Sequence, residues 1–91
     1  MEELLNNQNV TLVDVRSCEE FEEETIKGAL NIPLHTVPTR LDEFKSMKTP
    51  IIVFCRSGAR SNQATTYLKN QGIEVFDGGG IGSLKTIINR N

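Results

Sequence analysis

An apolar run that leads directly into a basic, glycine-containing loop is the feature that most constrains the fold of this chain. The run covers residues 51–55 and ends at Cys55. A short, continuous apolar run is typical of a strand in a parallel sheet that is covered on both faces. Residues 59–71 then have the pattern of a helix. The sequence therefore places Cys55 where a buried strand meets the start of a helix.

The six residues after Cys55 favour chemistry at its sulfur. They are Arg56, Ser57, Gly58, Ala59, Arg60 and Ser61. Loop N–H groups and the positive end of a helix can converge on a sulfur anion. Gly58 allows a tight turn with positive φ, and the two arginines add fixed positive charge. We interpret the segment as an anion cradle around one nucleophilic cysteine. The alternative is a buried structural cysteine that ends a strand.

Three further strands are predicted, at residues 11–15, 30–32 and 74–76, with helical stretches between them. This alternation is typical of a parallel sheet whose crossover connections are helices. A chain of 91 residues is near the lower limit for a self-sufficient core. We expect a single α/β domain over residues 1–91, with a small parallel sheet flanked by helices on both faces.

Capping signals give the expected helix boundaries. Ser17 and Glu20 form a capping box, which starts a short helix that runs to about Glu24 with Phe21 in the core. Gly72 is the expected C′ residue of the helix over residues 59–71.

Two other helices are predicted from spacing. Val37, Leu41 and Phe44 recur at helical intervals. Pro38 is tolerated because it falls in the first turn of that helix. Ser83 is the expected cap of the last helix, which carries its apolar residues on one face.

Charge and hydropathy exclude several classes of function. Ten Lys and Arg residues are balanced by twelve Asp and Glu residues, which gives a net charge of −2. We therefore expect no general attraction to nucleic acid or to an anionic membrane.

No stretch approaches the ~20 apolar residues of a transmembrane helix, and the first residues lack the basic and apolar regions of a secretory signal. We expect a monomeric, cytoplasmic protein.

The cysteines and the single histidine indicate no metal site. Cys18 and Cys55 do not have metal-ligand spacing, and His35 is the only histidine. We expect no metal and no cofactor. A disulfide between the two cysteines would sequester the candidate nucleophile, so we favour reduced thiols, which a cytoplasmic setting provides.

Four motifs follow one another along the chain. They are Leu12-Val13-Asp14-Val15-Arg16 with Glu20-Phe21, then Gly28-Ala29-Leu30-Asn31-Ile32-Pro33, then Cys55 to Arg60, and finally Asp77-Gly78-Gly79-Gly80. In this order they resemble a single-domain rhodanese, a thiosulfate sulfurtransferase. The last motif matches the glycine-rich turn that such domains carry after their last strand. The resemblance covers residues 12–80, which is most of the chain.

The resemblance implies a rhodanese-like fold of four to five parallel strands and a sulfurtransferase activity. Cys55 would take a sulfane sulfur from thiosulfate or a similar small anionic donor, hold it as a persulfide, and pass it to a thiophilic acceptor. A dithiol protein or another sulfur-acceptor protein could fill that last role. No histidine base is required, because the field of the loop lowers the pKa of the thiol.

The resemblance also implies roles for the loop and for the first motif. Residues 56–61 would bind the substrate; Arg56 would meet the anionic donor and Arg60 would close the loop. Arg60 could instead brace the loop by bonding its carbonyls or an acid. Asp14 and Arg16 are interpreted as structural, and Arg16 is close enough to Glu20 to form an exposed ion pair.

The chain departs from the family at three places. It starts at a helix instead of a short strand, so we expect four strands, or a fifth lost by truncation. Many relatives carry Gly-His-Ile where this chain has Glu24-Thr25-Ile26. Leu84 occupies a position where relatives often carry tryptophan. His35 is expected to be a surface or capping residue.

Two alternative functions stay open. The domain could be a sulfur carrier or interaction module that a partner persulfidates. Cysteine phosphatases and some arsenate reductases use a similar cradle, but their loops have five residues between Cys and Arg, whereas four separate Cys55 from Arg60 here. The shorter loop from Cys55 to Arg60 is better suited to enclosing a single sulfur atom than a tetrahedral phosphate.

Overall fold

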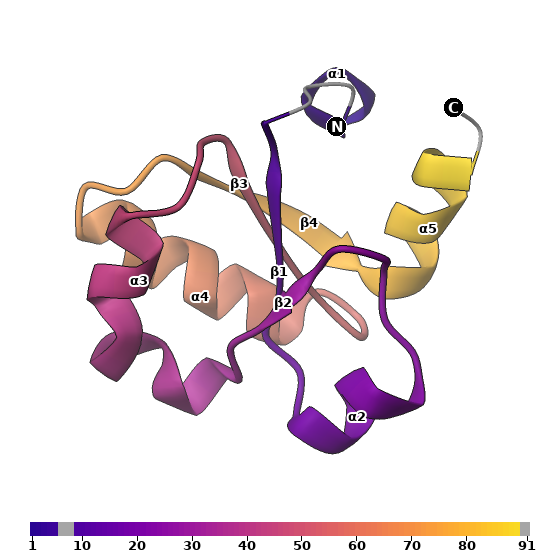
Figure 1. Ribbon diagram of the computed structural model, residues 1–91, viewed down its shortest axis with the longest axis horizontal. Coiled ribbons are helices and arrows are strands. Elements are labelled where there is room, and N and C mark those ends of the chain that lie inside the picture. The colour runs from indigo at the N-terminus through magenta and orange to yellow at the C-terminus, as the bar shows by residue number, and fades with distance from the viewer. Residues whose placement is uncertain (6–8, 90–91) are drawn as a thin grey trace.

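Four parallel strands form one sheet, and helices pack on both of its faces (Figure 1). The computed structural model describes residues 1–5 and 9–89. Within these residues the strands, in the spatial order β2-β1-β3-β4, are β1 (Thr11–Asp14), β2 (Leu30–Asn31), β3 (Ile51–Cys55) and β4 (Val75–Gly80). The described helices are α1 (Glu2–Leu5), α2 (Cys18–Glu23), the 3₁₀-helix η1 (Leu34–Arg40), α3 (Leu41–Lys45), α4 (Ala59–Asn70) and α5 (Ile81–Asn89). The predicted α/β class and parallel sheet are confirmed.

The central strand β3 is buried along its whole length. Ile51, Val53 and Cys55 belong to the core cluster to which α3 and α4 contribute. Ile52 and Phe54 belong to the opposite cluster, to which α5 contributes. This division follows from the two-residue period of a strand. It turns the Cys55 side chain toward the face that α4 covers.

The chain changes direction across the sheet between β1 and β3. β2 follows β1 on one side, and β4 follows β3 on the other. In open parallel sheets, a crevice forms outside the carboxyl ends of the strands at such a point. The N–H of Val15 donates to the carbonyl of Phe54, and the N–H of Leu34 donates to the carbonyl of Val15, each at 3.0 Å. The segments that leave β1, β2 and β3 therefore meet at one edge.

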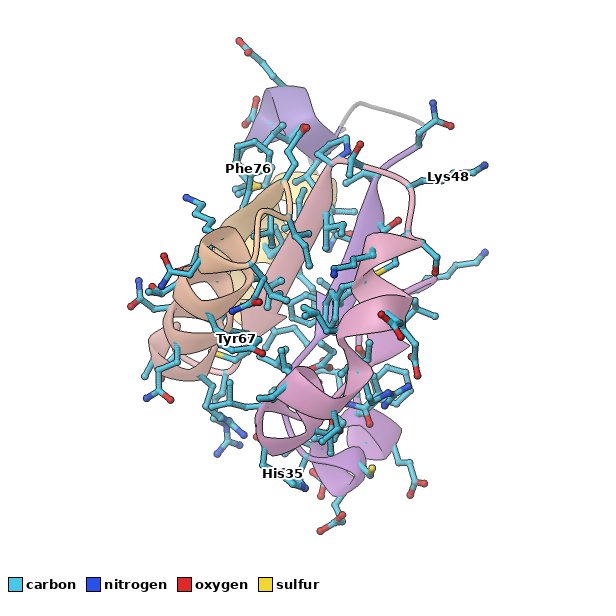
Figure 2. All side chains as sticks on the ribbon, turned by 90° about the vertical axis from the view of Figure 1, so that its left-hand side faces the viewer. His35, Lys48, Tyr67 and Phe76 are labelled. Carbon is cyan, nitrogen blue, oxygen red and sulfur yellow. The ribbon has the colours of Figure 1, made fainter. Side chains whose placement is uncertain are left out.

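This carboxyl edge lies at the end of the molecule where α2 is placed. His35, which follows β2, lies at that end, whereas Lys48, which precedes β3, lies toward the opposite end (Figure 2). Among the described helices, none is long and apolar enough to cross a bilayer.

Several predicted boundaries are confirmed. The Ser17 hydroxyl accepts a hydrogen bond from the Glu20 N–H, and the Glu20 carboxylate accepts one from the Ser17 N–H, which completes the capping box. α4 ends at Asn70, and Gly72 follows with φ +80°. Phe21 differs from expectation because it is only partly buried, and α2 carries no fully buried residue.

Two helices differ from the prediction. Residues 34–40 form the 3₁₀-helix η1 with Pro38 inside it, and α3 begins only at Leu41. Proline lacks the N–H of an α-helical ladder, and a short 3₁₀ segment tolerates that loss. α5 begins at Ile81 directly after β4, so Ser83 lies within the helix and does not cap it.

The glycine-rich motif belongs to β4 and is not a turn after it. β4 extends to Gly80, four residues beyond the predicted end at Phe76. Its pairing with β3 shifts register, since Val53 pairs with Asp77 while Phe54 pairs with Gly79. Such a β-bulge bends a strand and changes where its side chains point. The bulge therefore lies directly beside the end of β3 that carries Cys55.

Candidate active site

Cys55 is the last residue of β3, and its sulfur receives hydrogen bonds from the loop that follows. The residue is 1% exposed. The Gly58 N–H donates to Cys55 Sγ at 3.0 Å, and the Ser61 N–H donates to it at 3.3 Å. The predicted convergence of loop N–H groups on this sulfur is thus present in the fold.

The loop can close around the sulfur because Gly58 adopts a left-handed conformation. Its φ is +104°, a value that residues with a side chain rarely adopt. Gly58 is also the N-cap residue of α4 and has no side chain with which to cap the helix. Cys55 Sγ accepts the Ser61 N–H of the first helical turn instead. The sulfur therefore occupies the position of a helix cap, where negative charge is stabilised.

The surroundings of the sulfur favour its ionised form. Burial works to raise the pKa of Cys55, but hydrogen bonds, among them those from the N–H groups of Ser57, Gly58 and Ser61, outweigh it. The pKa of Cys55 is consequently held below the ordinary value of a thiol.

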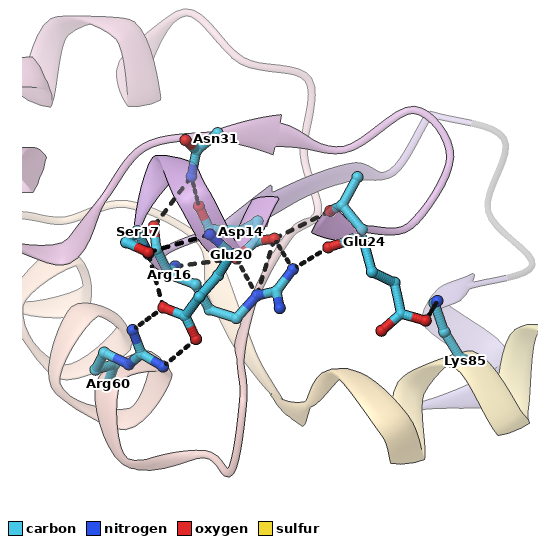
Figure 3. A network of polar contacts seen from close by, with 9 residues as sticks. Asp14, Arg16, Ser17, Glu20, Glu24, Asn31, Arg60 and Lys85 are labelled. Atoms are coloured by element: carbon cyan, nitrogen blue, oxygen red, sulfur yellow. Dashed lines mark hydrogen bonds and ion pairs between the residues drawn. The ribbon is translucent and has the colours of Figure 1, made fainter. Parts of the chain in front are cut away.

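The two loop arginines lie in different environments. Arg56 is exposed, directly beside the nucleophile. Arg60 is in the first turn of α4 and forms a two-pronged ion pair with Glu20 of α2, with N–O distances of 2.7 and 3.1 Å (Figure 3). Arg60 therefore has the acidic partner that the bracing interpretation requires, and its positive charge also interacts with Cys55.

The predicted pair between Arg16 and Glu20 is replaced by a buried pair within the first motif. Arg16 binds Asp14, with a shortest distance of 2.8 Å, and both side chains are almost fully buried. Asp14 also accepts a hydrogen bond from the Thr25 hydroxyl, and Asn31 donates to the carbonyls of Asp14 and Arg16 (Figure 3). A buried charge requires such a partner. The exposed pair was predicted from proximity in sequence, which gives no information on burial.

β4 supplies two contacts that motif spacing along the chain does not predict. The Ser61 hydroxyl lies 2.7 Å from Asp77 Oδ1. Gly80 lies against the loop, because a Cβ atom there would approach the carbonyl oxygen of Arg56 to 2.7 Å. The only signal in the sequence was the position of Asp77 directly before three glycines, a pattern that resembles the family but says nothing of its contacts.

A cavity of about 680 Å³ opens at the same carboxyl edge. Cys18, His35 and Arg60 are among its lining residues, whereas Cys55 is not. Cys18 and His35 are both exposed. Cys18 and Cys55 are free thiols. In the part of the chain that the structure describes, no three His, Cys, Asp or Glu side chains gather into a group that could hold a metal ion.

Comparisons with known proteins agree with this architecture. The Rhodanese-like domain family matches residues 1–80. The chain is 41% identical over 69 residues to a sulfurtransferase of Allochromatium vinosum. It is 35% identical over 69 residues to the putative sulfur carrier protein YrkF of Bacillus subtilis, and 35% identical over 71 residues to the thiosulfate sulfurtransferase PspE of Escherichia coli.

Each of these matches covers 76% of this chain, and they cover 64%, 37% and 68% of the respective relatives. The chain thus spans less than two thirds of the length of the first two. Among solved structures, a rhodanese with anions from E. coli aligns with a TM-score of 0.72 at 32% identity, over 80% of this chain and 88% of that chain.

Proposed function

The chain belongs to the rhodanese-like domain family, and from this premise we propose that it moves a sulfane sulfur from thiosulfate or a similar donor to a thiophilic acceptor through a persulfide on Cys55. The observation that carries the proposal is the convergence of the Gly58 and Ser61 N–H groups on the sulfur of Cys55. The names of two relatives, a sulfurtransferase and a thiosulfate sulfurtransferase, support the reaction class.

In the first step the Cys55 thiolate attacks the outer sulfur of thiosulfate. A bond forms between Cys55 Sγ and that sulfur, and the bond between the two sulfurs of the donor breaks. Its electron pair leaves with sulfite. The thiol proton has already passed to solvent, a loss that the lowered pKa of Cys55 favours. The terminal sulfur of the persulfide then carries a negative charge, which loop N–H groups can stabilise as they do an oxyanion.

In the second step the acceptor attacks the terminal sulfur. The bond between that sulfur and Cys55 Sγ breaks, and its electron pair returns to Cys55. The leaving thiolate is stabilised by the Gly58 and Ser61 N–H groups, which are 3.0 and 3.3 Å from Sγ. The same donors therefore favour ionisation of the Cys55 thiol before the attack and departure of the Cys55 thiolate in the second step.

The remaining loop residues have distinct proposed roles. Arg56 is exposed beside the sulfur and would bind the oxygens of an anionic donor with its planar fork. Arg60, held by Glu20, would contribute a fixed positive charge at the wall of the cavity. Ser57 and Ala59 would act through their backbone N–H groups.

Intact mass after incubation with thiosulfate tests the proposal. The wild type should gain one sulfur atom, and dithiothreitol should remove it. Cys55→Ser should gain none. Cys18→Ser is the matched control and should load like the wild type, because Cys18 is exposed and lies outside the loop. Loading that is lost in Cys18→Ser and kept in Cys55→Ser would overturn the assignment of the nucleophile.

A sulfur carrier is the second candidate, favoured by the similarity to the putative carrier YrkF. A carrier would be loaded by a cysteine desulfurase faster than by thiosulfate, and it would discharge to a protein acceptor faster than to a small dithiol. Comparing these four rates separates the two functions. Hydrolysis of para-nitrophenyl phosphate that depends on Cys55 would contradict both.

A further inference from the structure

A carboxylate lies one hydroxyl away from the proposed nucleophile. The Ser61 Oγ atom lies 2.7 Å from Asp77 Oδ1, 3.1 Å from the Gly58 carbonyl oxygen and 3.5 Å from Cys55 Sγ. Ser61 is fully buried, so water does not compete for its hydroxyl. A hydroxyl has one proton and two lone pairs. Only one of its three neighbours can therefore receive the proton.

Asp77 is the neighbour that receives it. Its contact is the shortest of the three, and a hydrogen bond to a carboxylate is about twice as strong as one to a neutral acceptor. The Gly79 N–H donates to the same Oδ1 atom at 2.9 Å, which holds the carboxylate in place. With its proton on the Asp77 side, Ser61 presents a lone pair to Cys55, and the thiol donates its own proton to Ser61 Oγ.

We propose that Asp77 is a positioning residue that holds the Ser61 proton away from the Cys55 sulfur and thereby balances this sulfur between its two roles, attacking nucleophile and leaving group. The proposal rests on the sulfurtransferase function. If the Ser61 proton turned to the sulfur, it would stabilise the thiolate. A more stabilised thiolate attacks more slowly and leaves faster. The loop N–H groups already stabilise the Cys55 thiolate. Asp77 prevents the Ser61 hydroxyl from stabilising this thiolate further.

Other charges around the sulfur set the background for this effect. Among the described residues they are Arg56 in the loop, Arg60 from α4 with its partner Glu20 from α2, and the paired Asp14 and Arg16 at the end of β1. Asp14 and Glu20 each have an arginine partner, and the charge of Asp77 reaches the sulfur through the Ser61 hydroxyl. Asp77 forms no ion pair with the residues of ranges 1–5 and 9–89, so its replacement changes the hydrogen bonding at the Cys55 sulfur without breaking an ion pair among them.

A pH titration tests whether Asp77 affects ionisation of the Cys55 thiol. It follows the ultraviolet absorbance of the thiolate in a Cys18→Ser background. Subtracting the curve of Cys18→Ser/Cys55→Ser removes the contribution of the single tyrosine. Asp77→Asn should move the ionisation midpoint of Cys55 down by about one pH unit, because the Ser61 hydroxyl, no longer held by a carboxylate, can donate its proton to the thiolate. Asp42→Asn, on the exposed side of α3, is the matched control and should leave the midpoint unchanged.

The two half-reactions test the consequence for transfer. Above both midpoints, Asp77→Asn should be loaded by thiosulfate roughly threefold more slowly, as the dependence of thiolate nucleophilicity on pKa requires. Discharge of the preformed persulfide to a dithiol should be severalfold faster. A purely structural role for Asp77 would instead slow both half-reactions together. That result would overturn the proposal.

The double variant Asp77→Asn/Ser61→Ala tests the route through the hydroxyl. Without Ser61 Oγ, the replacement of Asp77 should shift the midpoint by less than half as much as in the protein that keeps Ser61. An equal shift would show that the carboxylate acts directly and would overturn the role given to Ser61. If Asp77→Asn does not fold, Asp77→Ala serves the same comparison. Measuring the ionisation midpoint of Cys55 does not require sulfur transfer. If thiosulfate fails to load the protein, the proposed function is refuted, but the midpoint still tests the role of Asp77.

Discussion

Arg56 and Arg60 are two arginines of the same loop, but their environments suit them to different roles. Arg60 is bound on both of its terminal nitrogens by Glu20. Arg56 is exposed, and its side chain has no hydrogen bond or ion pair with any residue in the described ranges 1–5 and 9–89. A guanidinium that the fold does not use is available to a ligand, whereas one that is already paired must give up its partner first.

Arg56→Ala should therefore weaken donor binding without destabilising the fold. Loss of a charge-assisted hydrogen bond costs about 1.5–3 kcal/mol, which corresponds to a rise in KM for thiosulfate of roughly tenfold or more. Arg56→Lys should restore part of the affinity, because lysine keeps the charge and lacks the planar fork. Steady-state kinetics and a thermal melt provide the two measurements.

Lys69→Ala is the control for this prediction, because it removes one positive charge from the exposed last turn of α4. It should leave KM unchanged. If Arg56→Ala lowers Tm by several degrees and leaves KM unaltered, Arg56 holds the loop and does not bind the donor.

At the scale of elements, the end of β4 and the loop after β3 form one unit. Cys55 pairs with Gly80 in the sheet register. The Arg56 carbonyl lies so close to Gly80 that a Cβ atom there would be 2.7 Å from it. Because this clash would be with a backbone atom, rotating a side chain could not relieve it, and the loop itself would have to move. The glycines of β4 thus determine where the sulfur donors lie.

Gly80→Ala should destabilise the protein by about 1–3 kcal/mol, the usual cost of excess volume in a packed region. It should also slow persulfide formation, because the displaced loop carries the Gly58 N–H. Gly82→Ala is the matched control: it lies in α5, and its added Cβ would meet nothing within 4 Å. This control should be more stable than the wild type by up to about 1 kcal/mol. Urea unfolding checks both, and equal stability of the two variants would contradict the close approach at Gly80.

At the scale of the whole molecule, the Glu20–Arg60 pair joins α2 to α4 across the carboxyl edge of the sheet. The two residues are 40 positions apart. Hydrogen bonds from Arg60 and from the Ser17 N–H hold the pKa of Glu20 at about 2 instead of 4.5. A carboxylate with a lowered pKa in the folded state stabilises the fold above its unfolded pKa.

The contribution of Glu20 should consequently be complete above about pH 4.5 and disappear as the pH falls toward 2. Glu20→Gln should lower the free energy of unfolding by about 1–2 kcal/mol at pH 7, since the pair keeps some contact with solvent. The difference from the wild type should vanish near pH 2. Glu43→Gln, which breaks the more exposed pair with Arg40, should have a smaller effect at pH 7. A difference between Glu20→Gln and wild type that does not change with pH would contradict the ion pair.

The sequence by itself determined the parts of this protein whose cause is local. The buried run of β3, the capping box at Ser17 and the turn at Gly58 each follow from residues within a few positions of one another. The loop around Cys55 was predictable for the same reason, because its donors are N–H groups of the next six residues.

Only the tertiary structure decided which partners the polar side chains take. Asp77 reaches Ser61 across 16 positions, and Glu20 reaches Arg60 across 40. A charged side chain pairs with whichever opposite charge or hydrogen-bond donor the packed elements bring close to it. The separation of two residues along the sequence does not indicate their distance in space. The positions of α5 and of the bulge in β4 were missed for a related reason: close packing against β3 and its loop overrode the local turn and capping signals.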